Sequence, residues 1–361
     1  MTETPPPPGP PLPGPYLPPA PYGAPWPPPP QAPLPSAPAP VEPVEYHLVH
    51  RLGRWGTHGW WRPVVGLVVL AVLVLFVVQL VLLVAFTVGF LVTGSNDVQA
   101  SIERLLDTDN VTPSGLAYLN LALAGAIPAA MLVTWAFHGL RPGWLSSVLP
   151  RLRWRWLLVC LGLAFVALVV TLLISALLPS QGESTEMSTE LNDWTSTTRD
   201  FVLVVLFLTP LQAAGEEYAF RGYLTQAFGG LFAPLSPMVS RAAAVLLPAV
   251  LFALAHGAQE LPIFIDRLAF GVVAGILVIA TGGLEAGIAM HVLNNFVAFG
   301  FALAFGDMSS ALNPSGSTWW TLPVTLTQAL SYTALAILVG RAMKVRTRTD
   351  PVELVALNRR V

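Results

Sequence analysis

The sequence predicts an all-α, polytopic membrane protein of about eight transmembrane helices with a disordered proline-rich N-terminal tail. Of its 361 residues, 54% are hydrophobic and only 11% are charged, whereas a soluble globular chain carries about 25% charged residues. Apolar runs recur along the chain, each close to the roughly 20 residues that a helix needs to cross a bilayer. Prolines gather at one end, outside these runs. The predicted fold is therefore a bundle of membrane helices that follows an unpacked tail.

The predicted cytoplasmic tail covers residues 1–45, and 21 of the 35 prolines lie within it. Proline fixes φ and removes a backbone donor, so this segment cannot pack a core. Tyr16, Tyr22 and Trp26 lie among the prolines, a pattern compatible with a proline-recognising partner. A solvated tail without a partner is the alternative, and the sequence leaves both open.

Eight apolar runs after the tail are predicted to cross the bilayer. They lie at about 64–92, 115–137, 156–178, 201–228, 241–257, 262–281, 284–305 and 319–340. The sixth contains Gly271-x-x-x-Gly275, a spacing of small residues that lets another helix approach closely.

Basic loops alternate along the chain with acidic or neutral ones. Arginines and lysines precede the first span, lie between the second and third, and follow the last. The acidic or neutral loops are those at 97–109, 183–193 and around Asp307. Because basic loops stay in the cytoplasm, the pattern predicts a multi-pass cell-membrane protein with both termini cytoplasmic.

Composition also excludes several classes of partner. The net charge is −2 and no dense basic cluster lies outside the loops, so a nucleic-acid partner is not expected. Cys160 is the only cysteine, which rules out an intrachain disulfide and a thiolate metal cluster. The composition therefore predicts that the protein lies in a lipid bilayer.

Three groups of polar side chains interrupt the apolar runs, and such groups at bilayer depth are candidates for function. They are Glu216, Glu217 and Arg221 in the fourth span, His256 at the end of the fifth, and His291, Asn294 and Asn295 in the seventh. On a helix, Glu217 and Arg221 have the i,i+4 spacing of an ion pair. Glu216 points about 100° away from that pair, which leaves it available for chemistry.

Together these groups supply a carboxylate, imidazoles and a carboxamide, the components of a hydrolytic site. A carboxylate can take a proton from water, and histidine with asparagine can donate hydrogen bonds to an oxyanion. The side chains of Glu216, His256 and His291 are also of the types that coordinate catalytic zinc. Water activated by a glutamate needs no metal, so a divalent metal cofactor stays open. Taken singly, each group also suits an ordinary structural role in helix packing.

In order along the chain, Glu216-Glu217-x-x-x-Arg221, Phe252-x-x-x-His256 and His291-x-x-x-Asn295 resemble the motifs of the CPBP family. These are intramembrane peptidases that include Rce1-type CaaX proteases and Abi-like proteins. The resemblance implies a CaaX-protease-like endopeptidase, of a kind often called a metalloprotease, acting on a membrane-associated protein or peptide. It further implies these roles: Glu216 as general base, His256 as its assistant, His291 and Asn295 as oxyanion donors, and Glu217 and Arg221 in support.

The resemblance divides the predicted chain into four parts. After the tail come N-terminal transmembrane helices at 46–199, a catalytic core at 200–305, and a last helix with a basic cytoplasmic tail at 306–361. The alternative function is a non-catalytic membrane scaffold, an immunity protein or a proton-coupled transporter that uses the same groups. A hydrolase requires Glu216, His256 and His291 to converge on one water, whereas a proton relay would spread them across the bilayer.

The predicted spans place two of these residues at different depths. At 1.5 Å per residue, Glu216 falls near the cytoplasmic side, whereas His256, counted from Arg241, falls nearer the outer side. We therefore expect the fifth span to start deeper, or the fourth to break near Pro210 or Gly215.

Overall fold

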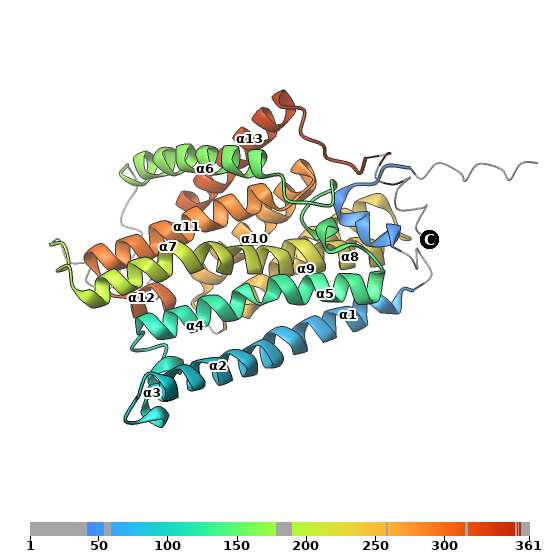
Figure 1. Ribbon diagram of the computed structural model, residues 1–361. Helices are drawn as coiled ribbons and strands as arrows, with labels where there is room; N and C mark the ends of the chain where they lie inside the picture. The colour runs from blue at the N-terminus through green and yellow to red at the C-terminus, as the bar shows by residue number, and fades with distance from the viewer. Residues whose placement is uncertain are drawn as a thin grey trace, which may run out of the picture. The chain divides into compact units, whose positions relative to one another are not determined.

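The computed structural model describes residues 42–53, 59–177, 190–257, 259–314, 317–350, 352 and 354. Within these ranges the secondary structure is helical, and the only β pairing consists of isolated bridges. The predicted all-α class is therefore confirmed (Figure 1). The prediction for the proline-rich tail falls outside the described residues, apart from residues 42–45, as do parts of the 183–193 loop and of the basic C-terminal tail.

In the described part of the chain, eight helices are long and apolar enough to cross a membrane, and each overlaps its predicted range. They are Trp61–Val92, Pro113–His138, Trp154–Ser175, Ser196–Phe232, Pro237–Ala255, Leu261–Thr281, Glu285–Phe305 and Thr321–Ala342. An integral membrane protein follows from their number and composition.

Three of these spans contain more than one helical element. The first joins α1 (Trp61–Val72), a π-helical segment and α2 (Gln79–Val92), and the second joins α4 (Pro113–Ala124) and α5 (Ala126–His138). The fourth joins α7 (Ser196–Glu217), the π-helical segment Tyr218–Leu224 and α8 (Thr225–Phe232).

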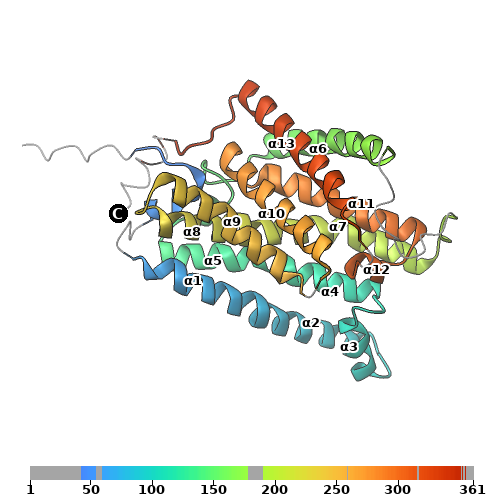
Figure 2. The ribbon, with the colours of Figure 1, turned by 180° about the vertical axis from the view of Figure 1, so that it is seen from behind.

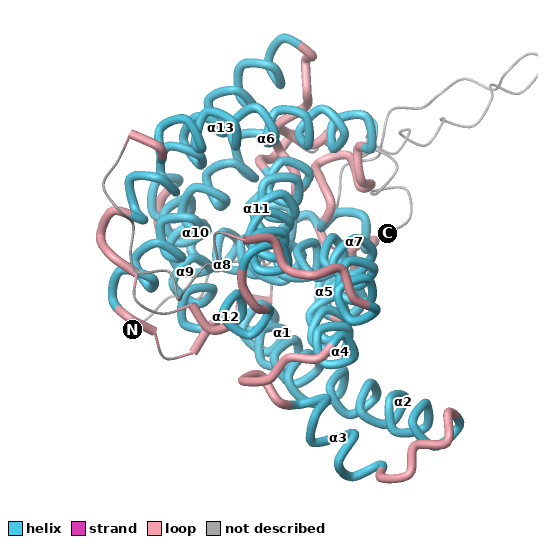
Figure 3. The backbone as a smooth tube through the Cα atoms, turned by 90° about the vertical axis from the view of Figure 1, so that its left-hand side faces the viewer, coloured by secondary structure: helices cyan, strands magenta, loops and turns pink. Residues whose placement is uncertain are grey.

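The other spans are single helices, and short helices lie between or beside the spans. The single spans are α6 (Trp154–Ser175), α9 (Pro237–Ala255), α10 (Leu261–Thr281), α11 (Glu285–Phe305) and α13 (Thr321–Ala342), and the short helices are α3 (Val98–Leu106), α12 (Met308–Leu312) and the 3₁₀ helices Tyr46–Leu52 and Pro142–Leu145. Figure 3 shows α6 and α13 side by side, well away from α2 and α3.

Helix α7, which carries the two adjacent glutamates, lies in the middle of the bundle. It packs against α4 on one side and α11 on another (Figures 1 and 2). A Cβ at Gly215 would overlap the backbone carbonyl oxygen of Leu123 on α4. The glycine immediately before Glu216 therefore permits the close helix crossing that fixes this part of α7.

The Gly271-x-x-x-Gly275 spacing serves the close approach predicted from it. Helix α10 packs along α9, and a Cβ at Gly271 would lie 3.0 Å from Cα of Ala249. A Cβ at Gly275 would lie 3.1 Å from Cγ1 of Val245. Small residues thus bring α10 against the helix that ends at His256.

The expected break in the fourth span is absent, and a helical hairpin resolves the conflict in depth instead. The span runs without interruption through Pro210 and Gly215, and only its hydrogen-bonding pattern changes, to π, over Tyr218–Leu224. It ends at Phe232, later than predicted, and α9 begins at Pro237, earlier than predicted. Glu216 lies 20 residues before Ser236, the N-cap of α9, and His256 lies 20 residues after it. The two antiparallel arms therefore return these side chains to the same level.

The basic segments meet at one end of the bundle. The α10–α11 turn pairs with the loop after α5 through a bridge between Ser147 and Gly283. Glu45, before the first 3₁₀ helix, makes ion pairs with Arg241 at 2.6 Å and with Arg348 at 3.1 Å. This clustering supports the alternation of loops on which the predicted orientation depends.

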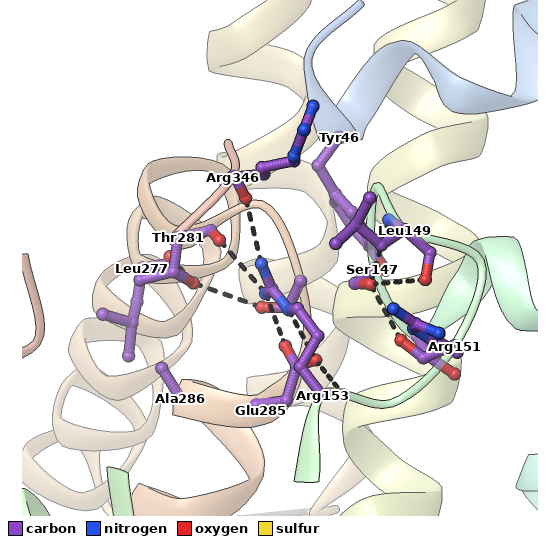
Figure 4. Close-up of polar contacts among 12 residues, drawn as sticks. Tyr46, Ser147, Leu149, Arg151, Arg153, Leu277, Thr281, Glu285, Ala286 and Arg346 are labelled. Atoms are coloured by element: carbon purple, nitrogen blue, oxygen red, sulfur yellow. Dashed lines mark hydrogen bonds and ion pairs between the residues drawn. The ribbon is translucent and has the colours of Figure 1, made fainter. Parts of the chain in front are cut away.

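A buried polar cluster at this end holds the start of α11 in place (Figure 4). Glu285, at the first position of α11, accepts hydrogen bonds from the backbone nitrogen of Arg153 at 2.8 Å and from its Nε at 2.8 Å and Nη2 at 2.6 Å. Arg153 also donates to the carbonyls of Thr281, at 3.1 Å, and Arg346, at 2.9 Å. Because nearly every polar atom of Arg153 and Glu285 has a partner, this ion pair is stable despite its burial. The cluster connects the start of α6, the end of α10, the start of α11 and the segment after α13, and so positions the helix that carries His291.

The buried His47 predicts how the stability of the segment around the first 3₁₀ helix depends on pH. Burial lowers the pKa of its imidazole to about 4, because the loss of hydration, together with the charge of Arg241, outweighs the attraction of Glu45 at 3.7 Å. The unfolded state therefore binds more protons between pH 6.5 and 4, so stability is complete above pH 6.5 and is lost as pH falls towards 4. We expect acidification across this window to cost about 1–3 kcal/mol, seen as a falling midpoint of thermal unfolding in detergent.

The matched variant for this prediction is His47→Gln, which cannot titrate. It should weaken the pH dependence without removing it, because burial also lowers the pKa of His50 in the same 3₁₀ helix. The ion pair with Arg241 lowers the pKa of Glu45, so that pair persists through the window. An unchanged slope in His47→Gln would assign the effect to other groups.

Candidate active site

One cavity of about 1340 Å³ lies among α1, α4, α7, α9, α10 and α11. Four of the predicted site residues line it, Glu216, His256, His291 and Asn295, and they come from three separate spans. Much of the remaining lining is apolar, including side chains of α1 and α4. The structure thus brings these predicted side chains to one cavity.

His291 lies at the centre of the polar cluster, between the two adjacent glutamates. Its Nε2 lies 3.1 Å from Oε2 of Glu216, and its Nδ1 lies 3.1 Å from Oε1 of Glu217. Carboxylate oxygens accept, so each ring nitrogen can donate to one of them. Glu216 and His291 are thus in direct contact, and His256 lines the same cavity, as the hydrolytic hypothesis requires.

Glu217 and Arg221 form the ion pair expected from their spacing, behind the cavity. Oε1 of Glu217 lies 3.1 Å from Nη1 of Arg221, and both side chains are buried. The guanidinium nitrogens make no hydrogen bond within the described chain. The guanidinium instead lies 4.1 Å from the ring centroid of Phe252 and 5.6 Å from that of Phe270. The charge is therefore stabilised by a carboxylate and two aromatic faces.

Gly287 on α11 provides the space for Glu217. A Cβ at this position would lie 2.6 Å from Oε2 of Glu217. That oxygen has no hydrogen-bond partner among the described residues, whereas Oε1 contacts both His291 and Arg221. The space left by Gly287 thus allows Glu217 to place its Oε1 against both His291 and Arg221.

His256 ends α9 and turns towards the cavity. Its Nδ1 lies 2.8 Å from the carbonyl oxygen of Phe252, and because a carbonyl only accepts, Nδ1 carries the proton in this bond. Nε2 is then the nitrogen available to a water in the cavity. The Phe252 ring lies 4.8 Å from the His256 ring and 6.1 Å from the His291 ring. Phe252, quoted only as part of a motif, thus separates and orients both histidines.

Two polar contacts involve residues that the sequence analysis did not single out. Asn295 donates from Nδ2 to Oε1 of Gln212 at 2.8 Å, and Gln212 lies one helical turn before Glu216 on α7. Asn294 accepts from Gln328 of α13 at 2.7 Å, as expected of an amide that joins two helices. The i,i+4 spacing of Gln212 and Glu216 was the signal that would have identified Gln212.

The arrangement of these side chains does not fit the zinc site that the sequence analysis left as an alternative. Both nitrogens of His291 face carboxylate oxygens, so neither presents a free lone pair. Within the described chain no group of three or more histidine, cysteine, aspartate or glutamate side chains is arranged to hold a metal ion. We therefore derive no step through a metal.

These features define a class: a polytopic membrane protein with a carboxylate, two histidines and a carboxamide converging in an intramembrane cavity. Residues 198–297 match the model of a family described as type II CAAX prenyl endopeptidase Rce1-like. All six predicted site residues fall in this matched segment, and the match confirms the resemblance seen in the motifs. Comparisons with curated proteins and with solved structures gave no match.

Proposed function

We propose that this protein is an intramembrane endopeptidase of the CaaX-protease type. It hydrolyses a peptide bond of a membrane-associated protein or peptide by means of water activated by Glu216. The observation that carries the proposal is the contact of Glu216 with His291, 3.1 Å apart in a cavity inside the bundle. The Rce1-like family of residues 198–297 supports the same reaction class.

The reaction begins with a water held between Glu216 and His256. Oε2 of Glu216 contacts His291, so Oε1 is the oxygen that takes the proton from the water. The water oxygen bonds to the peptide carbonyl carbon, and the carbonyl oxygen becomes an oxyanion. Glu216 then gives its proton to the amide nitrogen as the C–N bond breaks, which yields a carboxylic acid and an amine.

The other residues position these groups and stabilise charge. Asn295 and His291 donate to the oxyanion, and His291 must exchange its contact with Glu216 for this purpose. Glu217 holds Nδ1 of His291 and so orients the ring, as the third group of a catalytic triad does. Arg221 fixes Glu217 through the buried ion pair.

The proposed placement is a cell membrane, with both termini in the cytoplasm. The gathering of basic segments around Glu45, Arg241 and Arg348 at one end of the bundle supports it. This orientation would present the proline-rich tail to cytoplasmic partners, including a proline-recognising domain.

The test is a single turnover of detergent-purified protein in water enriched in ¹⁸O. Its probe is a farnesylated peptide that ends in a Cys-aliphatic-aliphatic-X sequence. We expect mass spectrometry to find one ¹⁸O in the new carboxylate, because the attacking oxygen comes from the solvent. An unlabelled product would show attack by a protein carboxylate and overturn the water mechanism.

Two additions separate the remaining possibilities. The same peptide without its farnesyl group shows whether the lipid is required, and a zinc chelator shows whether a metal takes part. Cleavage that persists in chelator supports glutamate-activated water alone. Absence of cleavage of both peptides would contradict the proposed activity on CaaX-type substrates.

A further inference from the structure

Arg267 of α10 is a cation inside the cavity that the proposed reaction does not use. Among the described residues that line the cavity, it is the only arginine or lysine, whereas Arg221 lies behind the wall. Its Nη1 donates to Oε1 of Gln259 at 2.6 Å, and it forms no ion pair in the described part of the chain. An arginine at bilayer depth without a carboxylate partner is costly unless it serves a ligand.

Gln259 holds the guanidinium in a defined place. Its own Nε2 donates to the carbonyl of Ala253 at 2.8 Å and to that of Gly257 at 3.2 Å. Both carbonyls lie at the end of α9, beside His256. Arg267 is therefore tied to the segment that carries a proposed catalytic histidine, while the rest of its five donors remain for another acceptor.

Arg267 also lies close to the reacting groups along α10. Phe270, three residues later, shares its face of the helix and lies 5.4 Å from the His291 ring between centroids. Three residues of helix rise about 4.5 Å, and an extended peptide spans about 3.3–3.6 Å per residue. Only a few substrate residues fit between a peptide bond at Glu216 and an anion at Arg267.

Two carboxylates also line the cavity, and they restrict where an anion can lie. These are Glu216 and Asp266. Asp266 directly precedes Arg267, so the two side chains diverge by about 100° around the helix. These two carboxylates repel an incoming anion where they lie, whereas the guanidinium of Arg267 attracts it.

We propose that Arg267 binds the free C-terminal carboxylate of the substrate peptide and so sets how far from the end the chain is cut. The inference rests on the proposed function. A guanidinium fork matches a carboxylate in two parallel hydrogen bonds, and the terminal carboxylate is the anion that every linear peptide carries whatever its sequence. Arg267 is thus a residue of substrate specificity and takes no part in the proton transfers.

The experiment compares the farnesylated Cys-aliphatic-aliphatic-X peptide as its free acid with the same peptide as its C-terminal amide. Wild type should show a KM about 10- to 100-fold lower for the acid, as expected for loss of a charged hydrogen-bonded pair. Arg267→Gln should raise KM for the acid to that for the amide. Arg267→Lys should keep part of the preference. Arg199→Gln, which removes an arginine exposed at 59%, is the matched control for loss of charge.

Binding measurements keep this test independent of the proposed chemistry. In Glu216→Gln, fluorescence anisotropy of the labelled acid and amide should show the same 10- to 100-fold preference without cleavage, and the Glu216→Gln/Arg267→Gln double variant should lose it. Equal affinity of the single variant for both peptides, or a preference that survives Arg267→Gln, would overturn the role of Arg267. If Arg267→Gln does not fold, the wild-type comparison and Arg267→Lys decide by themselves. Turnover of both peptides at equal KM would refute the carboxylate site and leave the peptidase intact.

Discussion

Glu216→Gln is expected to lower kcat/KM for peptide cleavage by about 10²- to 10⁴-fold, the usual contribution of a general base. The amide has nearly the shape of the carboxylate but cannot take a proton from water. The loss should fall on kcat, because Glu216 acts on the water and not on the binding of the peptide. Initial rates with the farnesylated peptide over a range of concentrations measure both constants.

The control for this change is Glu103→Gln on α3. Glu103 is exposed and accepts a hydrogen bond from Gln99 at 3.0 Å, so the same chemical change there should leave the rates as they are. Wild-type activity in Glu216→Gln would show that another group activates the water. Such a result would remove Glu216 from the mechanism while leaving the family of residues 198–297 unaffected.

Arg221→Met is expected to destabilise the fold by about 3–5 kcal/mol, because it removes the guanidinium that pairs with the buried Glu217 carboxylate. Glu217 is fully buried, and its second oxygen already lacks a hydrogen-bond partner in the described chain. Methionine preserves much of the contact with Phe252 and Phe270, so lost charge and not lost volume dominates. Thermal unfolding in detergent, followed by intrinsic fluorescence, measures the effect.

Two variants test whether charge is the cause. Arg221→Met combined with Glu217→Gln should recover part of the loss, because the stranded charge is removed as well. Arg199→Met breaks an exposed pair with Asp200 and should cost no more than about 1 kcal/mol. An Arg221→Met protein as stable as wild type would mean that Glu217 is neutral or reaches water.

The number of helices was predictable, and the candidate site residues could be singled out, because both depend on local sequence. A helix in lipid must satisfy its own backbone and present apolar side chains along about 20 residues, and so each span is visible by itself. The cost of a charge at that depth likewise marks Glu216, Glu217 and His291 without reference to their neighbours. The i,i+4 spacing of Glu217 and Arg221 was enough to predict their ion pair.

Depth in the membrane was not predictable in the same way. Span ends are defined by interfacial residues, and Arg241 was taken as the start of the fifth span although α9 begins at Pro237. The hairpin between α8 and α9 places its N-cap at Ser236, midway between Glu216 and His256. A shift of a few residues in one boundary was therefore enough to separate two side chains that the fold brings to one cavity.

By itself, the sequence determined that this protein is a helical membrane bundle and that its spans carry the glutamates, histidines and asparagine of an Rce1-like segment. Only the tertiary structure decided that His291 lies between two carboxylates, that Arg221 rests on Phe252, and that Arg267 faces the cavity beside Gln259. The physical reason is the distance along the chain between the residues that interact. Hydropathy and charge are properties of single segments, whereas each of these contacts joins residues from different segments and exists only after the helices have packed.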